Sequence, residues 1–201
     1  MICFVLGKPN SGKSLRAEEL AVSMADEHKV YVATMKVIDE AGRARVEKHR
    51  KQREGKGFET VELLYGLLKL PPMIEEPEKT TVLLECLSNL VGNEIYDNPK
   101  RSELRGFLKD GSAEAEKNPS AEESGEERTA SVEALKASKE RSFAEEITAE
   151  IRSLAEQVHC LVVVSTEYEP DSTFDEETMN YIRILNLVNE KVKAISDRMI
   201  R

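Results

Sequence analysis

The sequence has no tryptophan, and its few aromatic residues make up 5% of the chain. Its three cysteines, Cys3, Cys86 and Cys160, are far apart and form no C-x-x-C pair. This spacing excludes the usual zinc or disulfide frameworks and indicates free thiols in a reducing cytoplasm. No apolar run reaches the roughly 18 residues that a membrane span needs. The first residues also lack the basic segment and cleavage site of a secretory signal, so we expect a cytoplasmic protein.

Positive charge is scarce as well. The 201 residues include 29 Lys and Arg against 38 Asp and Glu, which gives a formal net charge of −9. A general nucleic-acid or anionic-membrane binder is therefore disfavoured, and we expect no nucleic-acid partner. The length suits one ordinary domain, which we place over residues 1–201.

Much of the negative charge lies in one segment. Residues 110–128 contain seven acidic and two basic residues, and none of the large apolar types. Such a segment cannot bury enough surface to offset its ordering entropy. We predict an acidic insertion over residues 97–140, disordered or loosely helical, that serves as a solvated linker.

Short apolar runs alternate with segments of helical periodicity along the chain. The runs predict buried strands at residues 2–6, 30–34, 80–84 and 160–165. The periodic segments predict helices at residues 14–27, 39–53, 60–70, 88–96, 143–158 and 175–199. This alternation predicts a three-layer α/β fold around a mostly parallel central sheet.

One motif fits G-x-x-x-x-G-K-[S/T] completely, between the first strand and the first helix. It consists of Gly7, Lys8, Pro9, Asn10, Ser11, Gly12, Lys13 and Ser14. Its glycines let backbone N–H groups surround a phosphate, and the helix N-terminus adds partial positive charge. Lys13 would reach the β- and γ-phosphates, and the Ser14 hydroxyl would ligate Mg²⁺. The motif predicts binding of a nucleoside triphosphate, ATP or GTP, but does not specify the reaction.

The third strand ends in a carboxylate, Glu85, where P-loop proteins place their second Mg²⁺ contact. Aspartate is the usual residue there. A carboxylate at this position could instead cap the next helix, and the sequence leaves both interpretations open.

Residues 43–53 carry six basic residues and one acidic residue in an otherwise acidic protein. Arg45, Lys48, His49 and Arg53 have the spacing of one helix face, which suits a triphosphate or a phosphorylated substrate. The alternative is a solvated basic surface. Cationic neighbours would lower the pKa of His49 and keep its imidazole neutral, so that it could attack phosphorus. The alternative for His49 is an ordinary surface histidine.

Several short motifs occur in an order that resembles one family, the bifunctional adenosylcobinamide kinase / adenosylcobinamide-phosphate guanylyltransferases of cobalamin biosynthesis. The matching residues are Ser11-Gly12-Lys13-Ser14, Ala17-Glu18, Tyr31-Val32-Ala33-Thr34, Asp39, Arg45-Val46, His49, Phe58-Glu59-Thr60-Val61-Glu62, Leu83-Leu84-Glu85-Cys86 and Asn93. The resemblance spans residues 1–96 and is specific because the motifs are ordered.

The resemblance implies a RecA-like P-loop fold, a homotrimer and two reactions. The first phosphorylates the aminopropanol hydroxyl of adenosylcobinamide with ATP or GTP. The second transfers GMP from GTP to that phosphate through a GMP–histidine intermediate, for which His49 is the matching residue. Lys13 would be catalytic, Ser14 and Glu85 would bind Mg²⁺, and Arg45, Lys48, Arg53, Glu62 and Glu85 would join the loop in nucleotide binding.

The chain departs from the family pattern in its second half and in single positions. Residues 166–170 lack the glycines of the family loop, Asn10 replaces an arginine, and Ala41-Gly42 replaces Glu-Met. Two alternatives therefore stay open. The chain could be a small-molecule P-loop kinase without the guanylyltransferase step, or a non-catalytic nucleotide-binding regulatory protein.

Overall fold

A computed structural model describes residues 1–25, 27–110 and 125–201 and contains one six-stranded sheet. Its strands are β1 (Ile2–Gly7), β2 (His28–Ala33), β3 (Glu59–Glu62), β4 (Thr80–Glu85), β5 (Cys160–Thr166) and β6 (Arg198–Ile200). Their order is β3-β2-β4-β5-β1-β6, and every pair is parallel. One strand, β5, separates β1 from β4, as in a RecA-like sheet. The predicted P-loop α/β fold with a parallel sheet is confirmed.

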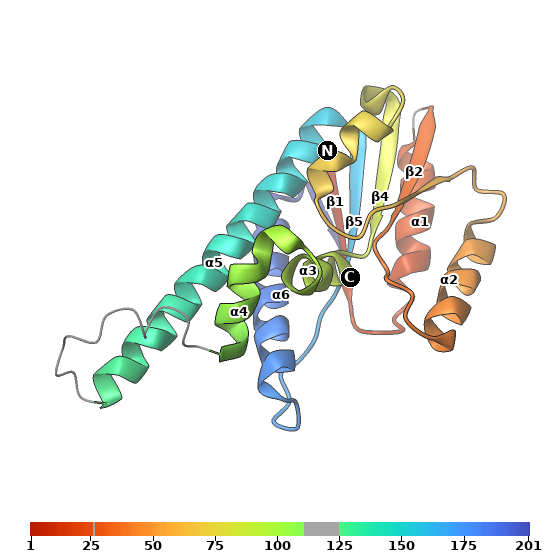
Figure 1. The fold of residues 1–201 in the computed structure, drawn as a ribbon. Helices are drawn as coiled ribbons and strands as arrows, with labels where there is room; N and C mark the ends of the chain where they lie inside the picture. Colours follow the sequence, from red (N-terminus) through yellow and green to blue (C-terminus); the bar gives the residue numbers. More distant parts are fainter. Residues whose placement is uncertain (26, 111–124) are drawn as a thin grey trace.

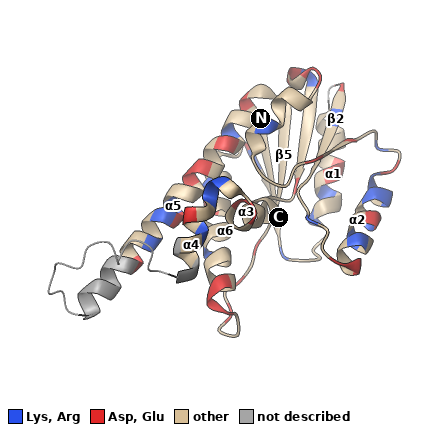
Figure 2. Ribbon diagram, in the orientation of Figure 1, with Lys and Arg blue, Asp and Glu red and all other residues tan. Residues whose placement is uncertain are grey.

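Helices cover both faces of the sheet (Figure 1). They are α1 (Lys13–Met24), α2 (Glu40–Arg53), α3 (Leu87–Tyr96), α4 (Ser102–Asp110), α5 (Gly125–Gln157) and α6 (Glu176–Ile195). Alternate strand residues form two cores: Phe4 and Leu84 pack with α3, α5 and α6, whereas Val5 and Leu83 pack with α1. Figure 2 shows Lys and Arg concentrated on α2. Within the described residues, no helix is long and apolar enough to span a membrane.

The helix predicted over residues 60–70 is wrong. The β-branched pair Thr60 and Val61 lies in β3, which extends the sheet beside β2. A short 3-10 turn begins at Leu67, just after Gly66, whose φ of 75° an α-helix does not tolerate. Leu63, Leu67 and Leu70 of this segment are buried as an amphipathic pattern requires, whereas Leu68 is 48% exposed.

The helix predicted over residues 175–199 is too long. It ends at Ile195, and the next residues form β6 alongside β1. Asp197 directs the chain at this point because its Oδ2 accepts a hydrogen bond of 2.7 Å from the Ile2 backbone N–H. The short apolar end of the chain thus adds an edge strand to the sheet.

The acidic insertion predicted over residues 97–140, disordered or loosely helical, contains helices in both of its described parts. Residues 102–110 form α4, and residues 125–140 form the beginning of α5. Leu104 and Leu108 pack against the core and anchor α4. Residues 111–124, which hold most of the acidic segment, lie outside the described residues.

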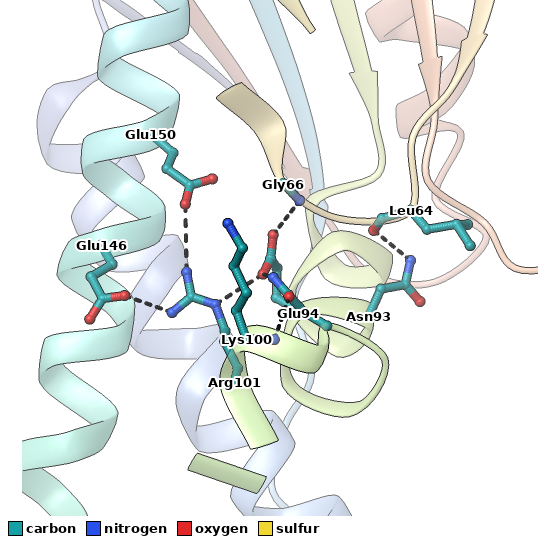
Figure 3. A network of polar contacts seen from close by, with 9 residues as sticks. Leu64, Gly66, Asn93, Glu94, Lys100, Arg101, Glu146 and Glu150 are labelled. Atoms are coloured by element: carbon teal, nitrogen blue, oxygen red, sulfur yellow. Dashed lines mark hydrogen bonds and ion pairs between the residues drawn. The ribbon is translucent and has the colours of Figure 1, made fainter. Parts of the chain in front are cut away.

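A buried ion network joins α3 to α5 (Figure 3). Glu94 on α3 is fully buried, and its Oε1 accepts a hydrogen bond of 2.7 Å from the Gly66 N–H. Its Oε2 accepts one of 3.0 Å from Nε of Arg101. Arg101 also pairs with Glu146 at 2.6 Å and Glu150 at 3.5 Å, both on α5. The neighbouring α3 residue, Asn93, donates to the Thr34 and Leu64 carbonyl oxygens at 2.7 and 2.9 Å, so α3 also holds the chain leaving β2 and β3.

We expect Arg101→Met to destabilise the protein by about 3–5 kcal/mol, because the buried Glu94 carboxylate would lose its cation. The free energy of unfolding in urea measures this loss. The matched control is Lys191→Met, which breaks the more exposed pair with Glu145 at 3.0 Å and should cost under about 1 kcal/mol. Equal losses in the two variants would contradict the role given to the network.

Candidate active site

The loop between β1 and α1 has the backbone of a phosphate cradle. Asn10 and Gly12 have φ angles of 60° and 82°, and Ser11 N–H donates to the Lys8 carbonyl at 3.3 Å. A Cβ at Gly7 would lie 2.7 Å from Ser11 Oγ, so a larger residue there would displace the Ser11 hydroxyl. Left-handed conformations of this kind occur in loops whose backbone N–H groups bind anions.

The two lysines of the loop lie differently. Lys13 is half-buried, and its Nζ donates to the Lys8 carbonyl at 3.4 Å, so its ammonium lies across the loop. Lys8 is exposed and pairs with Glu169 at 2.7 Å, while the adjoining Pro9 is exposed too. The segment after β5 also contacts the loop, since Glu167 N–H donates to the Gly7 carbonyl at 3.1 Å.

Ser14 and Glu85 are brought together at the first turn of α1. Ser14 Oγ donates to Glu85 Oε1 at 2.5 Å, and Glu85 Oε2 is buried with no hydrogen-bond partner in the described part of the chain. Burial raises the pKa of Glu85 to about 7, although the Ser14 hydrogen bond and the Lys13 charge oppose the rise. The N-cap of α3 is Cys86, so the alternative that Glu85 caps this helix is wrong.

This pair fits a magnesium ion. A serine hydroxyl and a carboxylate are the hard oxygen donors that Mg²⁺ takes in nucleotide sites. The unpartnered Oε2 and the raised pKa both indicate a buried carboxylate whose charge is only partly offset by Ser14 and Lys13.

The affinity for a Mg²⁺–nucleotide complex should fall as the pH drops through about 7, the pKa of Glu85. Below this pKa the carboxyl is protonated and must lose its proton to bind the ion, so affinity should fall by about tenfold per pH unit. Titration calorimetry over a pH series measures the change. The Glu85→Gln variant should bind weakly with a flatter profile that reports the nucleotide alone, and identical profiles would refute the assignment.

The basic helix α2 begins as predicted and is only partly solvated. Asp39 is its N-cap and accepts from Gly42 N–H at 2.7 Å. Arg45 and Lys48 are exposed, whereas Arg53 is half-buried, with its guanidinium carbon 3.3 Å from the ring centroid of Tyr31. The stacking fixes the end of α2 over β2. Arg53 thus differs from the other basic residues of α2, which are exposed, and for those the alternative of a solvated basic surface stays open.

His49 is not an ordinary surface histidine. It is half-buried, and its Nδ1 is buried without a partner among the residues described. Burial is the main cause that lowers its pKa, and the charges of Arg53, Lys48 and Arg45 lower it further. Glu18 on α1 opposes this shift. The imidazole is therefore neutral near pH 7, a state in which its nitrogen is nucleophilic.

Glu62 lies at the same edge of the sheet as Glu85. Both residues are in register with Ala33, one on each side of β2. Glu62 is exposed, and it sits at the carboxyl ends of the parallel strands, where ligands of open α/β sheets bind.

Two residues of this site were given no role from the sequence, although Glu18 belongs to one of the motifs that carry the family resemblance. Glu18 is fully buried, and its Oε2 forms an ion pair of 2.6 Å with Lys56, in the turn after α2. Glu18 lies four residues after Ser14 and therefore on the same face of α1, a spacing that could have indicated it. No local pattern indicates Lys56, because its partner is 38 residues away.

A pocket of about 720 Å³ lies beside the first turns of α2. Its walls are residues 35–45, α3 and the first turns of α6, and they include Arg45, Asn89, Tyr96 and Tyr181. Tyr181 is fixed by a 3.0 Å hydrogen bond from its hydroxyl to the Ser88 carbonyl. Ser88, three residues after Glu85, lines the pocket, whereas Ser14 and Glu85 are not among its lining residues.

The chain matches the family model "Cobinamide kinase / cobinamide phosphate guanyltransferase" over residues 3–201. The chain belongs to this family. The "Bifunctional adenosylcobalamin biosynthesis protein CobU" of Escherichia coli (strain K12) is 37% identical to it over 98 residues, which cover 48% of this chain and 51% of the relative. The chain thus spans about half the length of the curated cobinamide-family relative it matches.

Proposed function

We propose that this protein is an adenosylcobinamide kinase and adenosylcobinamide-phosphate guanylyltransferase of cobalamin biosynthesis. ATP or GTP would phosphorylate the aminopropanol hydroxyl, and GTP would then supply GMP to that phosphate. The observation that carries the proposal is the position of a half-buried, neutral His49 on a basic helix that is tied to α1, the helix that follows the phosphate loop. Family membership supports the same pair of reactions.

The kinase step rests on the loop and on Ser14 and Glu85. The loop N–H groups and Lys13 would bind the triphosphate and stabilise charge that develops on its oxygens. Ser14 and Glu85 would hold Mg²⁺, which, when bound, neutralises phosphate charge. Lys8, Pro9 and Asn10 form the exposed outer side of the loop.

The transfer step rests on α2. Nε2 of His49 would attack the α-phosphorus of GTP, the bond from that phosphorus to the bridging oxygen would break, and pyrophosphate would leave. An oxygen of the substrate phosphate would then attack the same phosphorus and release the imidazole. Arg45, Lys48 and Arg53 would stabilise the negative charge in both transition states, and Glu62 would contact the nucleotide.

The pocket beside Arg45 suits the acceptor. Its volume lies within the usual range of ligand pockets, roughly 300–1,000 Å³. Ile38 on its rim is 81% exposed, and a large ligand would cover this apolar side chain. An acceptor bound here would present its hydroxyl or phosphate toward the loop and α2.

The test is incubation with GTP, Mg²⁺ and adenosylcobinamide, followed by mass spectrometry of both protein and corrinoid. The proposal predicts GMP on the protein, and both adenosylcobinamide phosphate and its GDP ester in solution. If adenosylcobinamide phosphate forms but neither GMP-labelled protein nor the GDP ester is found, the alternative of a small-molecule kinase is supported. If the protein binds nucleotide but forms no product, the alternative of a non-catalytic regulatory protein is supported.

The proposal also includes a cytoplasmic location and assembly as a homotrimer. Cys3, Cys86 and Cys160 are free thiols, which suits the cytoplasm. The homotrimer stays a prediction, and light scattering of the purified protein tests it.

A further inference from the structure

The carboxylate of Glu18 has one satisfied oxygen and one free oxygen, although the side chain is fully buried. Oε2 forms an ion pair of 2.6 Å with the ammonium of Lys56, whereas Oε1 has no hydrogen-bond partner in the described structure. Lys56 reaches Glu18 from a turn whose flanking residues, Gly55 and Gly57, have φ angles of 75° and 73°. A buried carboxylate oxygen without a hydrogen-bond donor is energetically costly, so we expect it to accept a hydrogen bond in the working state of the site.

The imidazole of His49 offers such a donor. Its Nδ1 is also buried and unpartnered among the described residues. Glu18 is the acid whose charge acts most strongly on the ring, and it acts from α1, whereas the cations Arg53, Lys48 and Arg45 act from α2. The ion pair with Lys56 links the turn after α2 to α1 and holds the Glu18 carboxylate in place.

We propose that Glu18 is the positioning residue of His49, with its free Oε1 accepting a hydrogen bond from Nδ1–H. This inference rests on the proposed guanylyltransferase function. The hydrogen bond would fix the tautomer that carries its proton on Nδ1 and would leave the Nε2 lone pair free for phosphorus.

The same contact would stabilise the covalent step. As the Nε2–phosphorus bond forms, the bond to the bridging oxygen breaks and its electron pair leaves with pyrophosphate. The imidazole, still protonated on Nδ1, becomes positively charged, and the Glu18 carboxylate faces that proton. No proton moves in this step, and the charge on the ring disappears when the acceptor phosphate takes up the GMP group. The carboxylate thus orients the ring and offsets its charge.

The experiment compares Glu18→Gln with two other variants. Lys56→Met breaks the same ion pair but keeps the carboxylate. Glu19→Gln removes the negative charge of the residue next to Glu18, which is exposed on α1. Two quantities are measured: the pKa of His49 from the NMR titration of its ring C–H, and the initial rate of protein guanylylation by GTP across a pH series.

Glu18→Gln should lower the pKa of His49 and move the acidic limb of the rate profile to lower pH, because the ring loses its anionic neighbour. Its plateau rate should fall by about tenfold or more, as for other lost partners of functional histidines. Lys56→Met should raise the His49 pKa, because a cation is lost while the carboxylate remains. Glu19→Gln should leave both quantities unchanged.

An unshifted His49 pKa and rate profile in Glu18→Gln would overturn the inference, even if the rate fell at every pH. If Glu18→Gln does not fold, as judged by circular dichroism, Glu18→Asp takes its place. That variant keeps the charge and should keep the pKa while lowering the plateau rate, whereas an unchanged plateau rate would overturn the inference. Wild-type protein without any GMP label would instead overturn the proposed function, so the two failures are distinct.

Discussion

His49→Ala is expected to eliminate protein labelling by GTP that carries its label on the α-phosphorus. The reason is covalent: alanine has no nitrogen to form the bond to phosphorus. Loss of a covalent nucleophile costs at least about a thousandfold in rate, so GDP-ester formation should become undetectable. Phosphorylation of adenosylcobinamide from the γ-phosphate should persist, because Lys13, Ser14 and Glu85 remain in place.

The matched control is His159→Ala, which removes an exposed histidine far along the chain. GTP should label this variant to the same extent as the wild type. Full labelling of His49→Ala would show that another residue carries the GMP group, and loss of both activities would show that His49 supports the fold or the nucleotide site.

Lys13→Ala is expected to impair both reactions together. The Lys13 ammonium lies across the phosphate loop, 3.4 Å from the Lys8 carbonyl, where it would meet the β- and γ-phosphates of a bound triphosphate. Removing one preorganised donor to a charged transition state costs about 100-fold or more, and we expect this loss in kcat/KM for phosphorylation and guanylylation alike.

Steady-state assays of γ-phosphate transfer and GMP transfer measure the two losses in parallel. Lys193→Ala, on the exposed side of α6, is the control and should retain both rates. A Lys13→Ala variant that kept full guanylylation would contradict the idea of one triphosphate site shared by the two steps.

The central strands and the phosphate loop could be predicted because their signals are local. A buried parallel strand is a continuous apolar run, and the loop is fixed by glycines at set positions, such as Gly12 with its φ of 82°. The fold class alone places Glu85 at the carboxyl edge of the sheet, and the structure shows it level with Ala33 of β2.

Features that depend on tertiary contacts could not be predicted. The leucines after Glu62 have helical spacing, yet Gly66 and its bond to the buried Glu94 bend that segment into a loop. The end of α6 depends on Asp197 reaching Ile2, far away in sequence. In the site, the basic neighbours of His49 were visible in the sequence, but burial has the larger effect on its pKa, and the extent of burial depends on the tertiary fold.

The central claim is that a triphosphate held by the loop places its α-phosphorus in front of His49. A crystal structure with Mg²⁺ and a GTP analogue that cannot be cleaved between the α- and β-phosphorus atoms tests it most directly. The account predicts the β- and γ-phosphates inside the loop beside Lys13, with Nε2 of His49 directed at the α-phosphorus. A nucleotide seated in the loop while the imidazole points away from it, with α2 unable to bring the ring closer, would contradict the account.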